Sequence, residues 1–201
     1  MSKAQAAPHG RARFWQILFV ISLVALSWYL MQAVHEFGHV AAALFSGGTV
    51  QRVVLSPLEI SRTDVEPNPW PGLVVWAGPL VGCLLPLVVW LCAGRVPELV
   101  SKSLQFFAGW CLIANGGYIG LGTVERIGDC GEMLRTGTPP GVMVGFGLAT
   151  VAAGLYLWHR LGSLKEFWNH PEWITPRTAI TINLMLGGVV VLLAFISLID
   201  V

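Results

Sequence analysis

The sequence predicts an all-α polytopic membrane protein with about five transmembrane helices and a small membrane-associated β-hairpin after the first. Of its 201 residues, 55% are hydrophobic and only 11% are charged, and the mean hydropathy is +0.68. These values place the chain well outside the usual range of soluble domains. Five apolar segments approach or exceed the length that a helix needs to cross a bilayer. The nine tryptophans suit the interfacial belts of such a protein.

The first apolar segment runs from Phe14 to Phe45. At 1.5 Å per residue, a helix over this segment extends about 48 Å, which exceeds the roughly 30 Å hydrocarbon core. We therefore expect it to tilt, to break, or to project into protein or an aqueous vestibule. Because no clear cleavage site lies within it, we interpret the segment as a retained anchor and not as a signal peptide. Ser46-Gly47-Gly48 is typical of a helix stop.

Residues 49–65 have the composition of two short strands. The segments 49–55 and 58–65 are rich in Val, Ile, Thr and Leu with partial alternation, and Ser56-Pro57 separates them. This pattern favours a β-hairpin. Four more transmembrane helices are predicted at the apolar segments that follow, which are residues 72–93, 104–124, 141–158 and 179–199.

The two sides of this five-helix topology differ in basic residues. The side of the N-terminus has eight (Lys3, Arg11, Arg13, Arg95, Lys102, Arg160, Lys165, Arg177) and the other has four (Arg52, Arg62, Arg126, Arg135). By the positive-inside rule we expect a cytoplasmic N-terminus, and the far end of the first helix then faces the outer or lumenal side. The basic residues are dispersed and the net charge is +1, so the sequence predicts no nucleic-acid partner.

An HExxH pentapeptide, His35-Glu36-Phe37-Gly38-His39, lies near the end of the first apolar segment. On a helix, positions i and i+4 project from one face, so His35 and His39 can direct their imidazoles at one metal ion. Glu36 can accept a proton from the water of a bound zinc ion, which lowers the pKa of that water to around 7. Ionisable groups inside a membrane are costly and indicate function. The motif therefore predicts a Zn²⁺ hydrolase that works within the membrane.

A catalytic zinc ion usually has three protein ligands, so the two histidines need a partner. In the five-helix topology, the ends of the first and third helices lie on the same side. The acids best placed there are Glu125, Asp129 and Glu132, and Asp64 and Glu66 are weaker candidates. The topology alone leaves this choice open.

Three features follow one another in the chain. The HExxH helix continues through small residues into Gly47-Gly48, a strand-like stretch comes next, and Ala77-Gly78-Pro79 lies in the following apolar segment. Together they resemble the site-2 protease class of intramembrane zinc metalloproteases, peptidase family M50. In that family these features are the zinc helix, a membrane-associated β-region, and a helix whose small residues permit close packing.

The resemblance implies a third zinc ligand, because the family has an asparagine followed by Asp-Gly. Here Asn115 is followed by Gly128-Asp129-Cys130-Gly131, so Asp129 is the counterpart of the ligand, with Cys130 interrupting the pair. Asn115 resembles the asparagine that supports substrate or site. The implied activity is that of a zinc metalloendopeptidase that cleaves transmembrane segments of membrane proteins.

The implied organisation is a cytoplasmic tail at 1–13, a catalytic core at 14–135 and two additional helices at 136–201. One alternative is a non-proteolytic zinc-binding protein, or pseudoprotease. Another is a transporter-like protein, against which the sequence shows no evident inverted repeat. The four cysteines show no CxxC spacing; for Cys130, beside Asp129, packing and a metal or redox role both stay open. The sequence predicts neither the substrate nor the oligomeric state.

Overall fold

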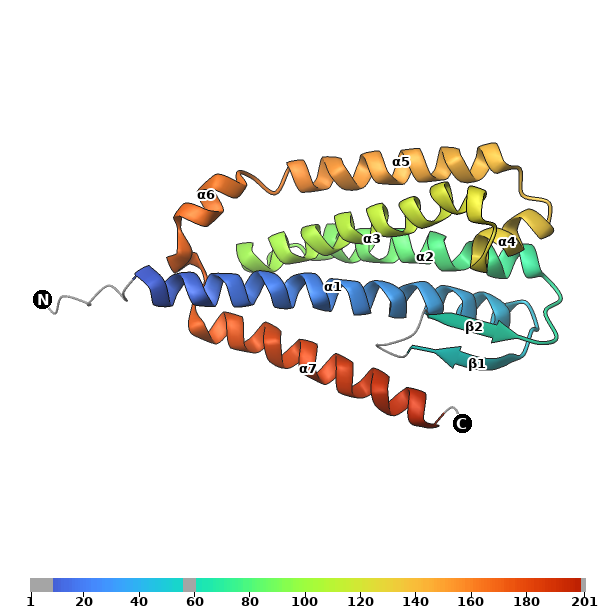
Figure 1. Ribbon diagram of the computed structural model, residues 1–201, viewed down its shortest axis with the longest axis horizontal. Helices are drawn as coiled ribbons and strands as arrows, with labels where there is room; N and C mark the ends of the chain where they lie inside the picture. Colours follow the sequence, from blue (N-terminus) through green and yellow to red (C-terminus); the bar gives the residue numbers. More distant parts are fainter. Residues whose placement is uncertain (1–8, 56–60, 200–201) are drawn as a thin grey trace, which may run out of the picture.

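Each of the five apolar segments forms a long helix, and successive long helices run in opposite directions in the computed structural model, which describes residues 9–55 and 61–199 (Figure 1). The long helices are α1 (His9–Phe45), α2 (Pro71–Cys92), α3 (Glu98–Glu125), α5 (Pro140–His159) and α7 (Pro176–Ile199). Their bounds lie within a few residues of those predicted, with the largest differences at the starts of α1 and α3. The all-α polytopic fold is confirmed.

The first helix is continuous over 37 residues, so of the three expected possibilities, a tilt, a break or a projection, the break does not occur. At 1.5 Å per residue it is about 55 Å long, and it must tilt or project to fit a bilayer. It ends where the glycines predicted a stop. Gly47 adopts a left-handed φ of 80°, and the Gly48 N–H donates to the Ala43 carbonyl at 2.8 Å. This is the Schellman arrangement, which satisfies carbonyls left open at a helix end.

The predicted hairpin is present as β1 (Val50–Val54) and β2 (Arg62–Val65), which pair antiparallel. Its predicted turn, Ser56-Pro57, and residues 58–60 lie outside the described residues. In β2 the side chains alternate between exposed and partly buried positions, and Thr63 is one of the partly buried residues. The hairpin lies along the C-terminal part of α1 (Figure 1).

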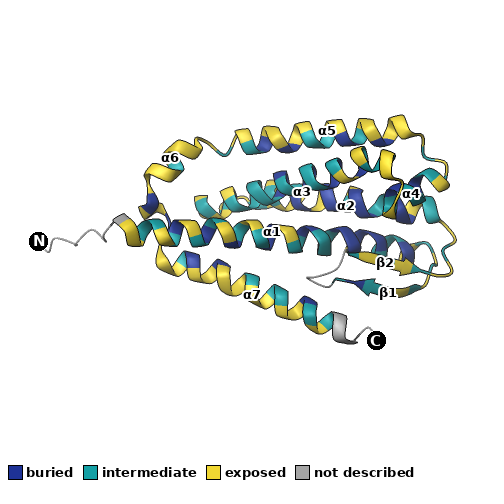
Figure 2. Ribbon diagram, in the orientation of Figure 1, coloured by how far each residue is buried: buried dark blue, intermediate teal, exposed yellow. Residues whose placement is uncertain are grey.

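Within the described ranges, four helices are long and apolar enough to cross a membrane, namely α1, α2, α5 and α7. The protein is therefore an integral, multi-pass membrane protein. α3 is longer than α2, α5 and α7 but is not among the four. It packs against α2, α5 and α1, and Figure 2 shows buried residues along it. Because neighbouring helices cover it, α3 tolerates polar residues such as Asn115.

Small residues bring α3 and α5 into backbone contact. A Cβ added at Gly116 would overlap Thr150 Oγ1, and one at Gly147 would lie 2.7 Å from the Gly116 carbonyl oxygen. A Cβ at Gly154 would likewise lie 2.7 Å from the Gly109 carbonyl oxygen. Glycines of this kind permit close helix approach inside a membrane. The contact holds α3 against the bundle along two helical turns or more.

Two short α-helices and a 3₁₀ turn were not predicted: α4 (Gly128–Arg135), α6 (Leu164–Asn169) and η1 (Pro171–Trp173). α4 turns back beneath the end of α3 and buries Cys130 and Met133 in a cluster with Val75, Ile119 and Met143. The Cys130 thiol faces the carbonyls of α3, so this cysteine packs within the bundle. That anchorage places the residue before it, Asp129, at the face of α1.

Candidate metal centre

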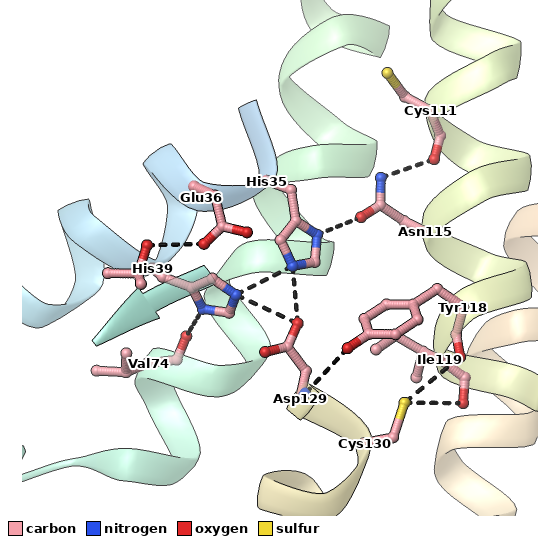
Figure 3. Close-up of polar contacts among 11 residues, drawn as sticks. His35, Glu36, His39, Val74, Cys111, Asn115, Tyr118, Ile119, Asp129 and Cys130 are labelled. Carbon is pink, nitrogen blue, oxygen red and sulfur yellow. Dashed lines mark hydrogen bonds and ion pairs between the residues drawn. The ribbon is translucent and has the colours of Figure 1, made fainter. Parts of the chain in front are cut away.

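The two histidines of the pentapeptide and Asp129 meet in the bundle (Figure 3). The Nε2 atoms of His35 and His39 lie 3.1 Å apart. Asp129 Oδ2 lies 2.8 Å from His35 Nε2 and 3.4 Å from His39 Nε2. Both imidazoles are buried and Asp129 is partly buried. Three potential ligand atoms therefore converge on one point, where α1 and α4 face each other.

The outer nitrogen of each imidazole is held by an oxygen acceptor. The Asn115 amide nitrogen donates to the Cys111 carbonyl at 2.9 Å, which turns its Oδ1 toward His35 Nδ1 at 2.6 Å. His39 Nδ1 donates to the Val74 carbonyl at 2.8 Å. These partners assign the ring proton to Nδ1 in both residues and leave a lone pair on each Nε2.

This arrangement fits a zinc ion. Two neutral imidazole nitrogens and one carboxylate oxygen face each other with lone pairs only, an arrangement that repels unless a cation lies between them. Ligand atoms bound tetrahedrally at about 2.0–2.1 Å lie about 3.3 Å apart, close to the 2.8–3.4 Å observed. Three such ligands leave a fourth position open, as in catalytic sites. Oxygen acceptors on the outer nitrogens are the usual partners of metal-binding histidines.

Asp129 is present as a carboxylate. Burial opposes its ionisation, but the hydrogen bonds and charge interactions that His35 and His39 make when their Nε2 atoms are protonated outweigh burial and hold the pKa of Asp129 well below its ordinary value. The main-chain N–H of Asp129 donates to the Tyr118 hydroxyl at 3.1 Å. The negative charge that a cation requires is therefore available at neutral pH.

Two glycines permit the close approach of α1 and α2 beside the imidazoles. A Cβ at Gly78, in the Ala-Gly-Pro segment of α2, would overlap the His39 ring and lie 2.9 Å from His35 Nε2. A Cβ at Gly38, between the histidines, would overlap the Ala77 carbonyl oxygen. No larger residue fits at either position unless the helices move apart. The small residues of the two motifs thus allow α1 and α2 to touch at the centre.

Glu36 lies beside the two imidazoles (Figure 3). Its side chain is only 2% exposed, and its Oε2 accepts a hydrogen bond from Thr63 Oγ1 of β2 at 2.8 Å. A buried carboxylate needs such a partner. The residue that could act as a base is therefore held by the hairpin.

The sequence profile of a family described as Peptidase M50B-like matches residues 12–114, just over half of the chain. The chain belongs to this family. The match confirms the resemblance to peptidase family M50. It covers nearly all of α1, the hairpin, α2 and the first part of α3. Among curated proteins and solved structures, no match is found.

The other acids considered as third ligands in this M50B-like protein lie elsewhere. Among the described residues, the cluster with metal-ligand spacing consists of His35, His39 and Asp129. Glu132 pairs with Arg135 at 2.6 Å and Asp64 with Arg62 at 3.5 Å. Glu125 is exposed, and Glu66 lies in the wall of a cleft between β2 and α4.

A cleft of about 750 Å³ leads to the candidate centre. It opens between β2 and α4 and reaches His39 and Asp129. Its walls carry charged groups of both signs, including Arg62, Asp64, Glu132 and Arg135. Water can therefore reach His39 and Asp129 from one side.

Three partners of the centre were not identified from sequence: Thr63, Val74 and Tyr118. Val74 contributes a main-chain carbonyl, which no residue type signals. Thr63 and Tyr118 have ordinary places in a strand and a helix. Short-range pattern carries no information about such tertiary contacts. The resemblance led us to expect that Asn115 supports the substrate or the site, and its Oδ1 lies 2.6 Å from His35 Nδ1.

We expect Asn115→Ala to weaken zinc binding by about 10–100-fold, because His35 loses the acceptor that orients its ring. Competition with a fluorescent zinc chelator in detergent micelles measures this affinity. Asn183→Ala is the matched control, since the Asn183 amide donates to Ser22 where α7 meets α1. Equal affinity of Asn115→Ala and wild type would show that the asparagine does not support the centre.

Proposed function

We propose that this protein is a zinc metalloprotease that hydrolyses peptide bonds in or near transmembrane segments of membrane proteins. One observation carries the proposal: His35 Nε2, His39 Nε2 and Asp129 Oδ2 lie within 3.4 Å of one another, and the Nδ1 atom of each imidazole faces an oxygen acceptor. Membership of the peptidase M50B-like family supports it.

The roles of the residues follow from their positions. When bound, zinc lowers the pKa of a water molecule to about 7 and polarises the scissile carbonyl. His35, His39 and Asp129 would hold the ion. Glu36 is the general base that takes a proton from the attacking water and then donates it to the leaving amine. Asn115 and the Val74 carbonyl keep both imidazoles in the tautomer that binds a metal.

The substrate must be locally extended, because hydrogen bonds within a helix shield its carbonyls. The cleft between β2 and α4 is lined by polar groups and reaches His39, which favours an unwound segment over a helix. β2 pairs with β1 on one edge in the described two-stranded sheet. We propose that an extended substrate segment pairs with the other edge by strand addition.

We also propose that the N-terminus is cytoplasmic. The alternation of the five long helices (Figure 1) puts the start of α1, at His9, and the loops before α3 and α7 at one end of the bundle. That end carries the larger share of Lys and Arg, as the positive-inside rule requires of a cytoplasmic face. The candidate centre then lies toward the other side.

Metal removal tests the proposed function. We expect the protein, purified and reconstituted in lipid nanodiscs, to cleave at least one of a panel of synthetic single-span peptides, with fragments identified by mass spectrometry. Dialysis against 1,10-phenanthroline should stop cleavage, and one equivalent of Zn²⁺ should restore it. Cleavage that survives complete zinc removal would contradict the mechanism. Stoichiometric zinc without cleavage of any peptide would instead favour a non-proteolytic zinc protein.

A further inference from the structure

The general base of the proposed reaction and the wall of the substrate cleft are joined by one hydrogen bond, from Thr63 to Glu36. We infer that Thr63 is a positioning residue that aims the Glu36 carboxylate and fixes it to β2. The inference rests on the proposed function, because it assigns to Thr63 a role in the action of Glu36.

The hydrogen bond from Thr63 limits the orientations that the Glu36 carboxylate can adopt. Glu36 is 2% exposed, and Thr63 Oγ1 donates to its Oε2 at 2.8 Å. A hydrogen bond to a charged acceptor is stronger than a neutral one. With Oε2 held, rotation of the carboxylate is restricted, and the other oxygen keeps one direction. A general base must lie within hydrogen-bond reach of the proton it removes, so this direction affects the rate.

The hydroxyl is itself held by the strand. Thr63 pairs with Val53 across the hairpin, and its β-branched side chain has few rotamers. Its neighbours Arg62 and Asp64 are exposed, whereas Thr63 is partly buried. Since strand residues alternate between faces, the register of the hairpin directs Thr63 to α1. The position of the Glu36 carboxylate therefore depends on the register of the hairpin and on how it packs against α1.

The same strand lines the cleft. Arg62, Thr63 and Asp64 form its wall together with His39 and Asp129. A segment bound along β2 would thus contact the element that holds Glu36, and one strand would align both base and substrate. Loss of the Thr63 hydroxyl should disturb the chemical step more than the binding of the substrate.

Thr63→Val tests the inference, since it removes the hydroxyl and keeps the β-branched shape that suits a strand. With the peptide that wild type cleaves best, we expect kcat to fall about tenfold while KM changes less than about twofold. Thr63→Ser restores the hydroxyl and should recover most of kcat. Thr49→Val is the matched control, because Thr49 is an exposed threonine just before β1. Zinc content should equal that of wild type in all three variants.

A second readout does not depend on turnover. Acetohydroxamic acid loses its O–H proton when it chelates zinc, and Glu36 is the neighbouring base that can accept that proton. The Kd of acetohydroxamic acid for the zinc-loaded protein, measured by isothermal titration calorimetry, should rise about tenfold in Thr63→Val. It should stay near the wild-type value in Thr63→Ser and Thr49→Val.

The outcomes separate this inference from the proposed function. Wild-type kcat and wild-type hydroxamate affinity in Thr63→Val would overturn the role of Thr63 while the protease stands. An equal loss in Thr63→Val and Thr63→Ser would also overturn it, because the hydroxyl would then not be the cause. If wild type binds zinc but cleaves nothing, the protease proposal fails, and the hydroxamate titration still decides whether Thr63 acts on Glu36.

Discussion

Glu36→Gln is expected to lower peptide cleavage by at least about 100-fold while zinc stays bound. The amide has nearly the shape of the carboxylate and can still accept the hydrogen bond from Thr63. It cannot take a proton from water, so the step that needs a base is lost. Cleavage of single-span peptides in nanodiscs, together with zinc content by inductively coupled plasma mass spectrometry, measures both quantities in one preparation.

Glu125→Gln is the matched control for this substitution. Glu125 is an exposed acid at the end of α3, so the same chemical change there should leave both cleavage and zinc content at wild-type values. Full activity of Glu36→Gln would show that the base is another group. Loss of zinc from Glu36→Gln would show that the glutamate acts on the metal site and not on the proton.

The second large effect concerns the metal itself. His35→Ala and Asp129→Ala should each weaken zinc binding beyond the roughly 10–100-fold that loss of a ligand's hydrogen-bond partner costs. Each variant removes one of the three converging donor atoms, and alanine offers no replacement. Zinc per protein after gel filtration in metal-free buffer is the measurement, and we expect it to fall from one equivalent to near zero.

Glu132→Ala tests whether the loss is specific to Asp129. Both acids lie on α4, but Glu132 pairs with Arg135 and does not belong to the converging group. It should therefore keep one equivalent of zinc. If Asp129→Ala kept its zinc and Glu132→Ala lost it, the third ligand would be misassigned. If His35→Ala kept its zinc, the metal site itself would be misplaced.

Much of the architecture could be predicted because it depends on local properties. Apolar length locates the long helices, and the glycines after Phe45 locate the end of α1. The i, i+4 spacing of His35 and His39 needs only a helix to bring both Nε2 atoms together. These signals act over a few residues, so the fold of the rest of the chain does not alter them.

The acid that completes the candidate metal centre could not be chosen from such local signals. Glu125, Asp129 and Glu132 all lie at or just after the end of α3, and topology alone could not rank them. The fold separates them because Gly128, at a φ of 55°, opens α4, and Cys130 and Met133 anchor that helix. Its apolar residues at i and i+3 are a weak amphipathic signal that could have indicated α4. The rotation of Asp129 toward the histidines follows only from the packing.

The glycine contact between α3 and α5 has a practical consequence for anyone who would shorten this chain. The matched family region ends at residue 114, and a truncated protein that stops after α4 would retain all three candidate ligands. It would also expose the backbone of α3 at Gly109 and Gly116, where α5 now lies against it. Lipid chains are too disordered to fill so narrow a surface as closely as a helix does. We therefore expect the smallest unit that folds on its own to extend at least to His159, the end of α5.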